Sequence, residues 1–262
     1  MNGLKRLQAI TKQLRDPIDG CEWDRVQTFA SLKSYTLEET YEVLDAIDHQ
    51  NMQELKNELG DLLFQIIFYA DLANEQGEFN FDDICNAVAD KLVSRHPHIF
   101  TDKMKEKPNW EQLKQQERDK RAQYSILDDI PNSIPALMKA EKIQKRCASV
   151  GFDWNELQPV LDKVKEEIGE VEQELNQTER NKQKIEEELG DLFFATVNLA
   201  RHLKVKSELC LQQANKKFER RFKQVESILK QKDRALPNAT LEEMEDAWQS
   251  VKQLEQDNKR LK

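Results

Sequence analysis

The stretch Glu-Leu-Gly-Asp-Leu-Leu-Phe at residues 58–64 returns almost unchanged at residues 188–194 as Glu-Leu-Gly-Asp-Leu-Phe-Phe. A second shared pattern lies upstream, because Glu-Glu-x-x-Glu occurs at residues 38–42 and again at 166–170. The copies of the two motifs are separated by 188 − 58 = 130 and 166 − 38 = 128 positions. Two independent motifs that recur at nearly the same offset indicate a duplicated structural unit.

Apolar residues around the repeated motif follow the spacing of a helix. Between residues 55 and 67, leucines and isoleucines are separated by four, three, one, three and one positions, which places them on one helical face. Similar stripes occupy residues 185–197 and 160–175, and no segment alternates like a strand. Only seven Gly and seven Pro occur, and 34% of the residues are charged, which is typical of long helices. The sequence therefore predicts an all-α protein of two tandem modules, each a small antiparallel bundle.

A break in the helical pattern separates the two copies. Residues 124–135, with the sequence Tyr-Ser-Ile-Leu-Asp-Asp-Ile-Pro-Asn-Ser-Ile-Pro, contain two prolines and interrupt the periodicity. We therefore predict an N-terminal module at residues 1–120, a linker at 121–135 and a C-terminal module at 136–262.

Charge and composition restrict the classes of partner. The net charge of −9 argues against a nucleic-acid-binding protein, which needs Lys and Arg to neutralise phosphates. The most apolar stretch, residues 62–73, contains Gln65 and Asp71 and is too short to span a bilayer, and the N-terminus resembles no signal peptide. The four cysteines lack metal-ligand spacing, which indicates reduced thiols. We expect a cytoplasmic protein that binds neither nucleic acid nor membrane.

The repeated acids have the spacing of a metal site. Glu167 and Glu170 are three apart and share one helical face, as do Glu188 and Asp191. If the two helices pack antiparallel, four carboxylates converge and require a counter-charge, for which Mg²⁺ suits an all-oxygen site with open positions. The first copy offers a candidate second site in Glu39, Glu42, Glu58 and Asp61.

The same acids permit a second interpretation, in which they are solvated faces of a non-catalytic helical interaction or regulatory protein. Their recurrence in order and at matching separation favours the metal site. Gly60 and Gly190 also lie in the middle of predicted helices, where Gly is costly, so we expect a close approach there. No His follows a Glu by three residues, which argues against a di-iron bundle.

These motifs resemble those of the MazG family of nucleoside triphosphate pyrophosphohydrolases, within the all-α NTP pyrophosphatase superfamily. The family signature is Glu-Glu-x-x-Glu followed by Glu-x-x-Asp, and 15 residues (43–57) or 17 residues (171–187) intervene here. The segment from Leu14 to Thr28 also resembles the family's entry segment. The resemblance implies Mg²⁺-dependent hydrolysis of an NTP or dNTP to the monophosphate and pyrophosphate by a homodimer. It implies that the C-terminal copy is catalytic, with Glu167, Glu170, Glu188 and Asp191 as metal ligands.

Further residues are candidates for binding the substrate of such an enzyme. Lys163 and Lys184 each precede a predicted metal ligand by four residues, and Lys217 and Arg221 share one helical face. Such cations can neutralise phosphate charge. Trp248 can stack on a base without discriminating among bases, so we expect broad base tolerance, although a core or interface role for this ring is nearly as well supported. Glu166 and Glu187 are candidates for the base that takes a proton from water.

Two local features complete the predictions. Pro97 ends the helix that carries Lys91 and Arg95, whereas residues 215–229, with Lys217 and Arg221, can continue as helix. Asp153 or Asn155 can cap the helix that follows Trp154.

Overall fold

The computed structural model describes residues 2–100 and 125–260, and every regular element in these ranges is a helix. The chain divides into two compact units, Met1–Leu113 and Lys114–Lys262. The predicted all-α class is therefore confirmed. No helix in the described ranges combines the length and apolar character needed to cross a membrane.

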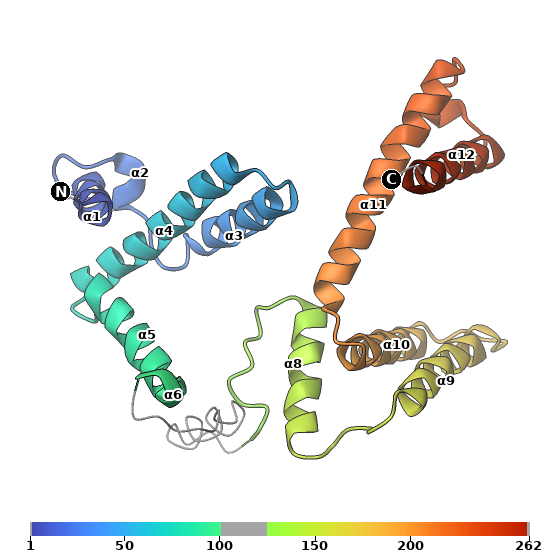
Figure 1. The fold of residues 1–262 in the computed structure, drawn as a ribbon, viewed down its shortest axis with the longest axis horizontal. Coiled ribbons are helices and arrows are strands. Elements are labelled where there is room, and N and C mark those ends of the chain that lie inside the picture. The colour runs from blue at the N-terminus through green and yellow to red at the C-terminus, as the bar shows by residue number, and fades with distance from the viewer. Residues whose placement is uncertain (1, 101–124, 261–262) are drawn as a thin grey trace. The chain divides into compact units, whose positions relative to one another are not determined.

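The N-terminal unit is built on a helical hairpin with further helices packed against one arm. Helices α3 and α4 form the hairpin, and α1 and α5 pack against α4 (Figure 1). The buried side chains of Leu32, Phe68 and Leu72 form its core. Asn51 begins α4, because its side chain accepts a hydrogen bond from a first-turn amide. The helices are α1 (Gly3–Leu14), α2 (Glu22–Arg25), α3 (Lys33–Asp48), α4 (Met52–Glu75), α5 (Phe81–Arg95) and α6 (Pro97–Phe100).

The C-terminal unit repeats the hairpin and adds a second one. Helices α9 and α10 form the first hairpin, and α8 packs against α10 (Figure 1). Helix α11 then extends away, and α12 packs back along it through buried Val225, Leu229, Ala247 and Val251. The elements are α8 (Ala136–Ser149), α9 (Leu157–Leu175), α10 (Lys182–His202), α11 (Ser207–Gln231), the 3₁₀-helix η1 (Leu236–Asn238) and α12 (Leu241–Arg260).

Two predictions about helices in the repeats have opposite outcomes. Helix α5 ends at Arg95 before Pro97, whereas α11 runs unbroken through Lys217 and Arg221, as predicted. The expected close approach at Gly60 and Gly190 was wrong for the described part of this chain. A Cβ atom at either glycine meets no neighbouring atom within 4 Å, so the chain's own packing does not require Gly there.

A buried arginine joins the helices of the N-terminal unit. Arg15 is 8% exposed, and its Nη2 lies 2.6 Å from a carboxylate oxygen of Glu75. Its Nε lies 3.2 Å from Asp71, and its Nη1 donates to the backbone carbonyl of Asp24 at 2.7 Å. The guanidinium also lies over the Phe68 ring, 4.9 Å from the centroid. One side chain thus holds the end of α1, the short helix α2 and the last turns of α4 together.

We expect Arg15→Met to lower the free energy of unfolding of the N-terminal unit by about 3 kcal/mol, because two carboxylates and a buried carbonyl lose their cation. Hydrogen–deuterium exchange of α4 peptides in the full chain measures this change. Arg6→Met removes the same charge from an exposed position of α1 and serves as the control. Equal exchange in the two variants would show that the Arg15 contacts do not stabilise the unit.

Candidate active site

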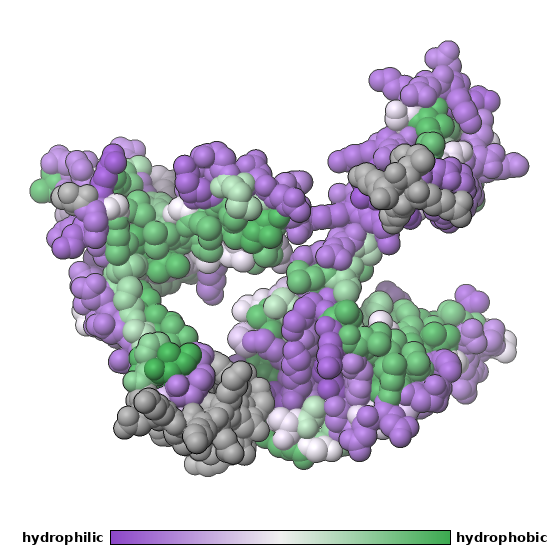
Figure 2. Space-filling view, viewed as in Figure 1, coloured by the Kyte–Doolittle hydropathy of each residue, from purple (hydrophilic) through white to green (hydrophobic). Residues whose placement is uncertain are grey.

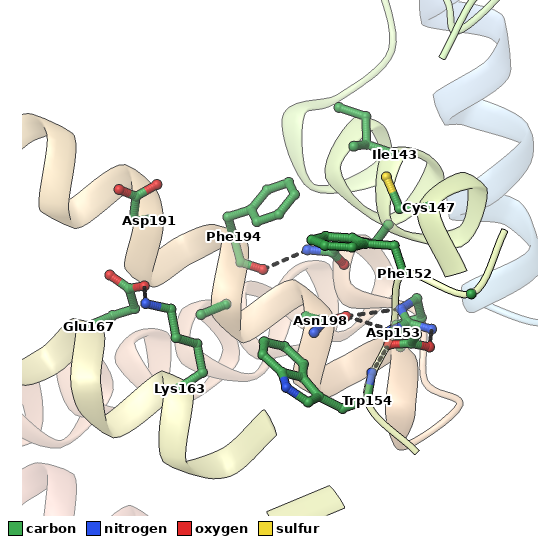
Figure 3. A pocket seen from close by; sticks show the side chains of 14 residues that line it. Ile143, Cys147, Phe152, Asp153, Trp154, Lys163, Glu167, Asp191, Phe194 and Asn198 are labelled. Carbon is green, nitrogen blue, oxygen red and sulfur yellow. Dashed lines mark hydrogen bonds and ion pairs between the residues drawn. The ribbon is translucent and has the colours of Figure 1, made fainter. Parts of the chain in front are cut away.

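The four acids predicted to bind a metal lie on the facing helices of the α9–α10 hairpin. A carboxylate oxygen from each of Glu167, Glu170 and Glu188 lies within 4.8 Å of the other two. Asp191 follows Glu188 by almost one turn and lines the same pocket as Glu167 (Figure 3). Asn181 begins α10 by accepting hydrogen bonds from two first-turn amides, which sets where the Glu188 turn starts. The short connection forces the two helices to face each other and brings these acids together.

The charge in this cluster is only partly neutralised. Glu167 is 4% exposed, and its Oε1 lies 2.7 Å from Lys163 Nζ. Its Oε2 is buried without a hydrogen-bond partner among the described residues. The neighbouring Glu167 carboxylate raises the pKa of Glu170, and the contacts with Glu166 and Glu167 raise the pKa of Lys163. One lysine cannot neutralise four carboxylates, so the cluster has the charge, the all-oxygen donors and the free buried oxygen that suit a divalent cation.

The N-terminal unit has a matching acidic cluster. Oxygens of Glu39, Glu58 and Asp61 lie within 4.8 Å of one another. Partial burial and the charges of Asp61 and Glu42 raise the pKa of Glu39. Partial burial, followed by the charge of Glu42, raises the pKa of Glu58. The four acids of this copy therefore also share one electrostatic environment.

The two copies differ in the residues beside the acids. The position of Lys163 is occupied in the first copy by Tyr35, since 163 − 128 = 35, and Tyr35 packs against the core. The position of Asn198 is occupied by Phe68, since 198 − 130 = 68, and Phe68 is 1% exposed inside that core. The first copy therefore keeps the acids, but an apolar ring of the core stands where the C-terminal copy has a pocket-lining amide.

A pocket of about 650 Å³ adjoins the acids of the C-terminal unit. At one end it is lined by Lys163, Glu167 and Asp191, and at the other by Phe152 and Trp154, as Figure 3 shows. The side chains of Ile143, Cys147, Phe194 and Ala195 also line it. The pocket thus joins a charged end suited to phosphate and metal with an apolar, aromatic end.

The loop that carries the aromatic side chains is tied to the last turn of α10. Arg201 donates to both carboxylate oxygens of Asp153, and His202 Nε2 lies 3.0 Å from Asp153 Oδ1. These contacts, with Arg201 first, lower the pKa of Asp153. The prediction that Asp153 or Asn155 caps the next helix was wrong. Helix α9 begins after Glu156, and Asp153 is engaged by a residue 48 positions away.

The other acidic-cluster neighbours predicted from sequence are more exposed. Glu166 accepts a hydrogen bond from Lys163 Nζ at 2.8 Å. Lys184 lies on α10 with its Nζ 3.9 Å from a carboxylate oxygen of Glu174, so it forms an ion pair with that residue. Glu187 accepts from Gln183 at 3.1 Å. Of these residues and Lys163, only Lys163 lines the pocket.

Lys217, Arg221 and Trp248 lie on the α11–α12 hairpin, and none of them lines the pocket. Arg221 donates to Glu255 Oε2 at 2.8 Å, and its guanidinium lies 5.7 Å from the Trp248 ring centroid. The contacts with Arg221 and Arg220 lower the pKa of Glu255 to about 2. Trp248 is half-buried against Phe218, with ring centroids 5.1 Å apart, and Lys217 is exposed. The α11–α12 hairpin therefore carries all three of these predicted residues, and none of them is part of the pocket that borders the acids.

Of the fourteen residues that line the pocket, eleven were not predicted as site residues, and Phe152, Trp154 and Asn198 are among them. Trp154 corresponds to Trp23 of the first copy, at an offset of 154 − 23 = 131, and Phe152 stands two positions before it. Asn198 follows Asp191 by seven residues, so helical spacing places both on one face of α10. That spacing is the signal that could have identified Asn198.

Comparison with known proteins adds independent observations. A model of the MazG nucleotide pyrophosphohydrolase domain matches residues 27–100 and 156–226, which include both acidic clusters. The chain is 56% identical over 262 residues to a nucleoside triphosphate pyrophosphohydrolase of Escherichia coli (strain K12), covering 98% of this chain and 100% of the relative. It is 39% identical over 249 residues to the nucleoside triphosphate pyrophosphohydrolase/pyrophosphatase MazG of Thermotoga maritima, covering 95% of each. It is also 39% identical to the uncharacterized protein YabN of Bacillus subtilis, over 95% of this chain and 51% of YabN.

Proposed function

Because the chain belongs to the MazG family of nucleotide pyrophosphohydrolases, we propose that it hydrolyses nucleoside triphosphates, NTP and dNTP alike, to the monophosphate and pyrophosphate with Mg²⁺. One water is consumed for each phosphoanhydride bond broken. The observation that carries the proposal is the continuous pocket of the C-terminal unit, which joins the acidic cluster to an aromatic end (Figure 3).

The acidic cluster and the pocket lining would bind different parts of such a substrate. Glu167, Glu170, Glu188 and Asp191 would hold the magnesium ion. When bound, the ion supplies positive charge for the phosphates and makes water more acidic. Lys163 Nζ, which already contacts Glu167 at 2.7 Å, provides a further cation at the phosphate end. The aromatic end, which includes Trp154, provides apolar surface on which any base can stack.

The C-terminal copy is the one that we propose to be catalytic. Its pocket continues beyond the acids, whereas Phe68 fills the corresponding place of the N-terminal copy and is 1% exposed. Tyr35 also replaces the cation that Lys163 provides. A metal bound by Glu39, Glu58 and Asp61 would therefore lack the neighbouring features that hold a nucleotide in the other copy.

The alternative of a non-catalytic protein with solvated acidic faces is less well supported. Solvated acids would be expected to face water. Here Glu167 Oε2 is instead buried without a hydrogen-bond partner among the described residues, and Glu167 and Asp191 border a largely apolar pocket. We propose that the enzyme acts in the cytoplasm on free nucleotides. House-cleaning of non-standard nucleotides and control of the nucleotide pool both fit its broad base tolerance.

We expect the protein to convert ATP to AMP and pyrophosphate only when Mg²⁺ is present. Each of the substitutions Glu188→Gln and Asp191→Asn removes a carboxylate that would hold the magnesium ion. We expect either one to reduce kcat by about 100-fold or more, because the ion that neutralises the phosphates binds more weakly. Chromatography of the nucleotides, with phosphate and pyrophosphate measured separately, gives the products. Unchanged melting temperatures would show that the variants fold, and ADP with orthophosphate as the products would contradict the proposal.

The paired substitution Glu58→Gln with Asp61→Asn tests the assignment to the C-terminal copy. We expect this N-terminal variant to retain the wild-type kcat, because the aromatic side chain of Phe68 leaves no room for a nucleoside beside these acids. The matched C-terminal variant, Glu188→Gln with Asp191→Asn, should lose activity. Equal losses in the two variants would assign catalysis to both copies.

We further propose that the enzyme is a homodimer formed through the α9–α10 hairpin. Its surface exposes the large apolar side chains of Ile168, Leu189 and Phe193, the last of which is 61% exposed. Figure 2 shows apolar surface over these helices. Burial of such a patch favours association. A second copy also offers a way for Lys217 and Arg221 to reach phosphates, since these residues do not line the pocket of their own chain.

Phe193→Asp should convert a dimer into a monomer, because a charge replaces the most exposed apolar side chain of the hairpin. Light scattering on a sizing column should give twice the chain mass of 30.8 kDa for the wild type and the single mass for the variant. Ile18→Asp, at an exposed loop position of the N-terminal unit, is the control and should remain dimeric. A wild type of single mass would refute the dimer.

A further inference from the structure

Asn198 lies where the pocket meets the network that anchors the aromatic loop. It is on α10, half-buried, and lines the pocket together with Trp154 (Figure 3). Its Oδ1 accepts two hydrogen bonds from Arg201, from Nε at 3.0 Å and from Nη2 at 2.8 Å. No described residue accepts a hydrogen bond from its Nδ2.

The arginine determines which way the Asn198 amide faces. A guanidinium carries five N–H donors and no acceptor, so only the oxygen of an amide can face it favourably. Turning the amide over would place an NH₂ group against two donors and lose both hydrogen bonds. The Asn198 oxygen is therefore committed to Arg201, and the NH₂ group is left for the pocket.

The arginine is itself held in place. Both carboxylate oxygens of Asp153 accept hydrogen bonds from it, and its side chain is 12% exposed. This bidentate pair fixes the plane of the guanidinium, and therefore the direction of the Asn198 amide. In the first copy the corresponding positions hold Phe68 and Asp71, since 201 − 130 = 71, so the arrangement belongs to the C-terminal copy alone.

We propose that Asn198 is a residue that determines base recognition, and that its NH₂ group donates a hydrogen bond to an acceptor atom on the nucleobase of the bound triphosphate. Arg201 and Asp153 act through it as positioning residues. The inference rests on the proposed function, because it takes the aromatic end of the pocket to be the nucleoside site.

A fixed donor has a defined chemical consequence. Every common base carries ring-nitrogen or carbonyl acceptors, so one NH₂ group can serve all of them. The site therefore gains affinity for the base without strong selection among bases. A group that only accepts hydrogen bonds would repel the same atoms.

The decisive variant is Asn198→Asp, which keeps the shape of the side chain and its contacts with Arg201 but turns the donor into an acceptor. We expect KM for ATP and UTP to rise about 10-fold or more, since a hydrogen bond is lost and an oxygen faces an acceptor. kcat should change less than KM. Tripolyphosphate, which carries the phosphates without a base, should inhibit the variant and the wild type with the same constant.

Substitutions of the arginine test the positioning role separately. Arg201→Lys retains a donor without an acceptor, so it should preserve the orientation of the amide and stay near the wild-type KM. Arg201→Gln offers both a donor and an acceptor, lets the Asn198 amide turn over and should raise KM for ATP. A merely structural role of Arg201 would instead weaken ATP and tripolyphosphate together. Asn74→Asp, on an exposed position of α4, is the control for the added charge.

Each outcome separates this inference from the proposed function. A wild type that forms no nucleoside monophosphate overturns the proposed function itself. An active wild type whose Asn198→Asp variant keeps its KM for ATP, or loses tripolyphosphate affinity in parallel, overturns the role of Asn198 and leaves the enzyme assignment intact. A selective rise in KM for nucleotides, absent from Asn74→Asp, supports it.

Discussion

Repulsion among carboxylates on two facing helices is the constraint on which the C-terminal unit depends. The α9–α10 hairpin brings oxygens of Glu167, Glu170 and Glu188 within 4.8 Å of one another, and Glu167 is almost fully buried. Lys163 offsets only part of this charge. The unit can tolerate the arrangement because helix packing elsewhere stabilises it, and because a cation that joins the cluster lowers its energy. Binding of a cation to the cluster is therefore favourable even without a nucleoside.

The two copies show how a duplicated module can keep one feature and lose another. Both retain the acids, since each pair of helices still presents carboxylates one turn apart. The difference arises about two and three turns further along, where Phe68 occupies the place of Asn198 and Asp71 the place of Arg201. In the first copy Arg15 from another helix pairs with Asp71 and covers the Phe68 ring. The same region has therefore become a packed core in one copy and an open pocket in the other.

The helices and the meeting of the acids could be predicted from the sequence because both follow from local spacing. Glu167 and Glu170 must share a face of any helix, and a short connection must turn the next helix back toward them. The role of Asp153 could not be predicted in this way. Its cap prediction failed because α9 begins only after Glu156, and the Asp153 carboxylate instead accepts two hydrogen bonds from Arg201, 48 positions away. The position of Trp248 against Arg221 likewise depends on how α12 folds back, which spacing alone does not specify.

The two ends of the pocket would contribute differently to the affinity for a nucleotide and to the selectivity among bases. In the proposed function, the charged end would contact the phosphates that all nucleoside triphosphates share, and such contacts cannot distinguish one base from another. The aromatic end is largely apolar, and apolar surface discriminates weakly between rings of similar size. The amide of Asn198, in the role that we propose for it, would add a hydrogen bond that every base can accept. Strong preference for one base would require a second polar group at a fixed position beside Trp154. Arg201 does not meet this requirement, because it is already paired with Asp153 and Asn198. The proposed tolerance of many bases therefore requires that the unpaired oxygen of Gln144, which also lines the pocket, makes no selective contact with the base.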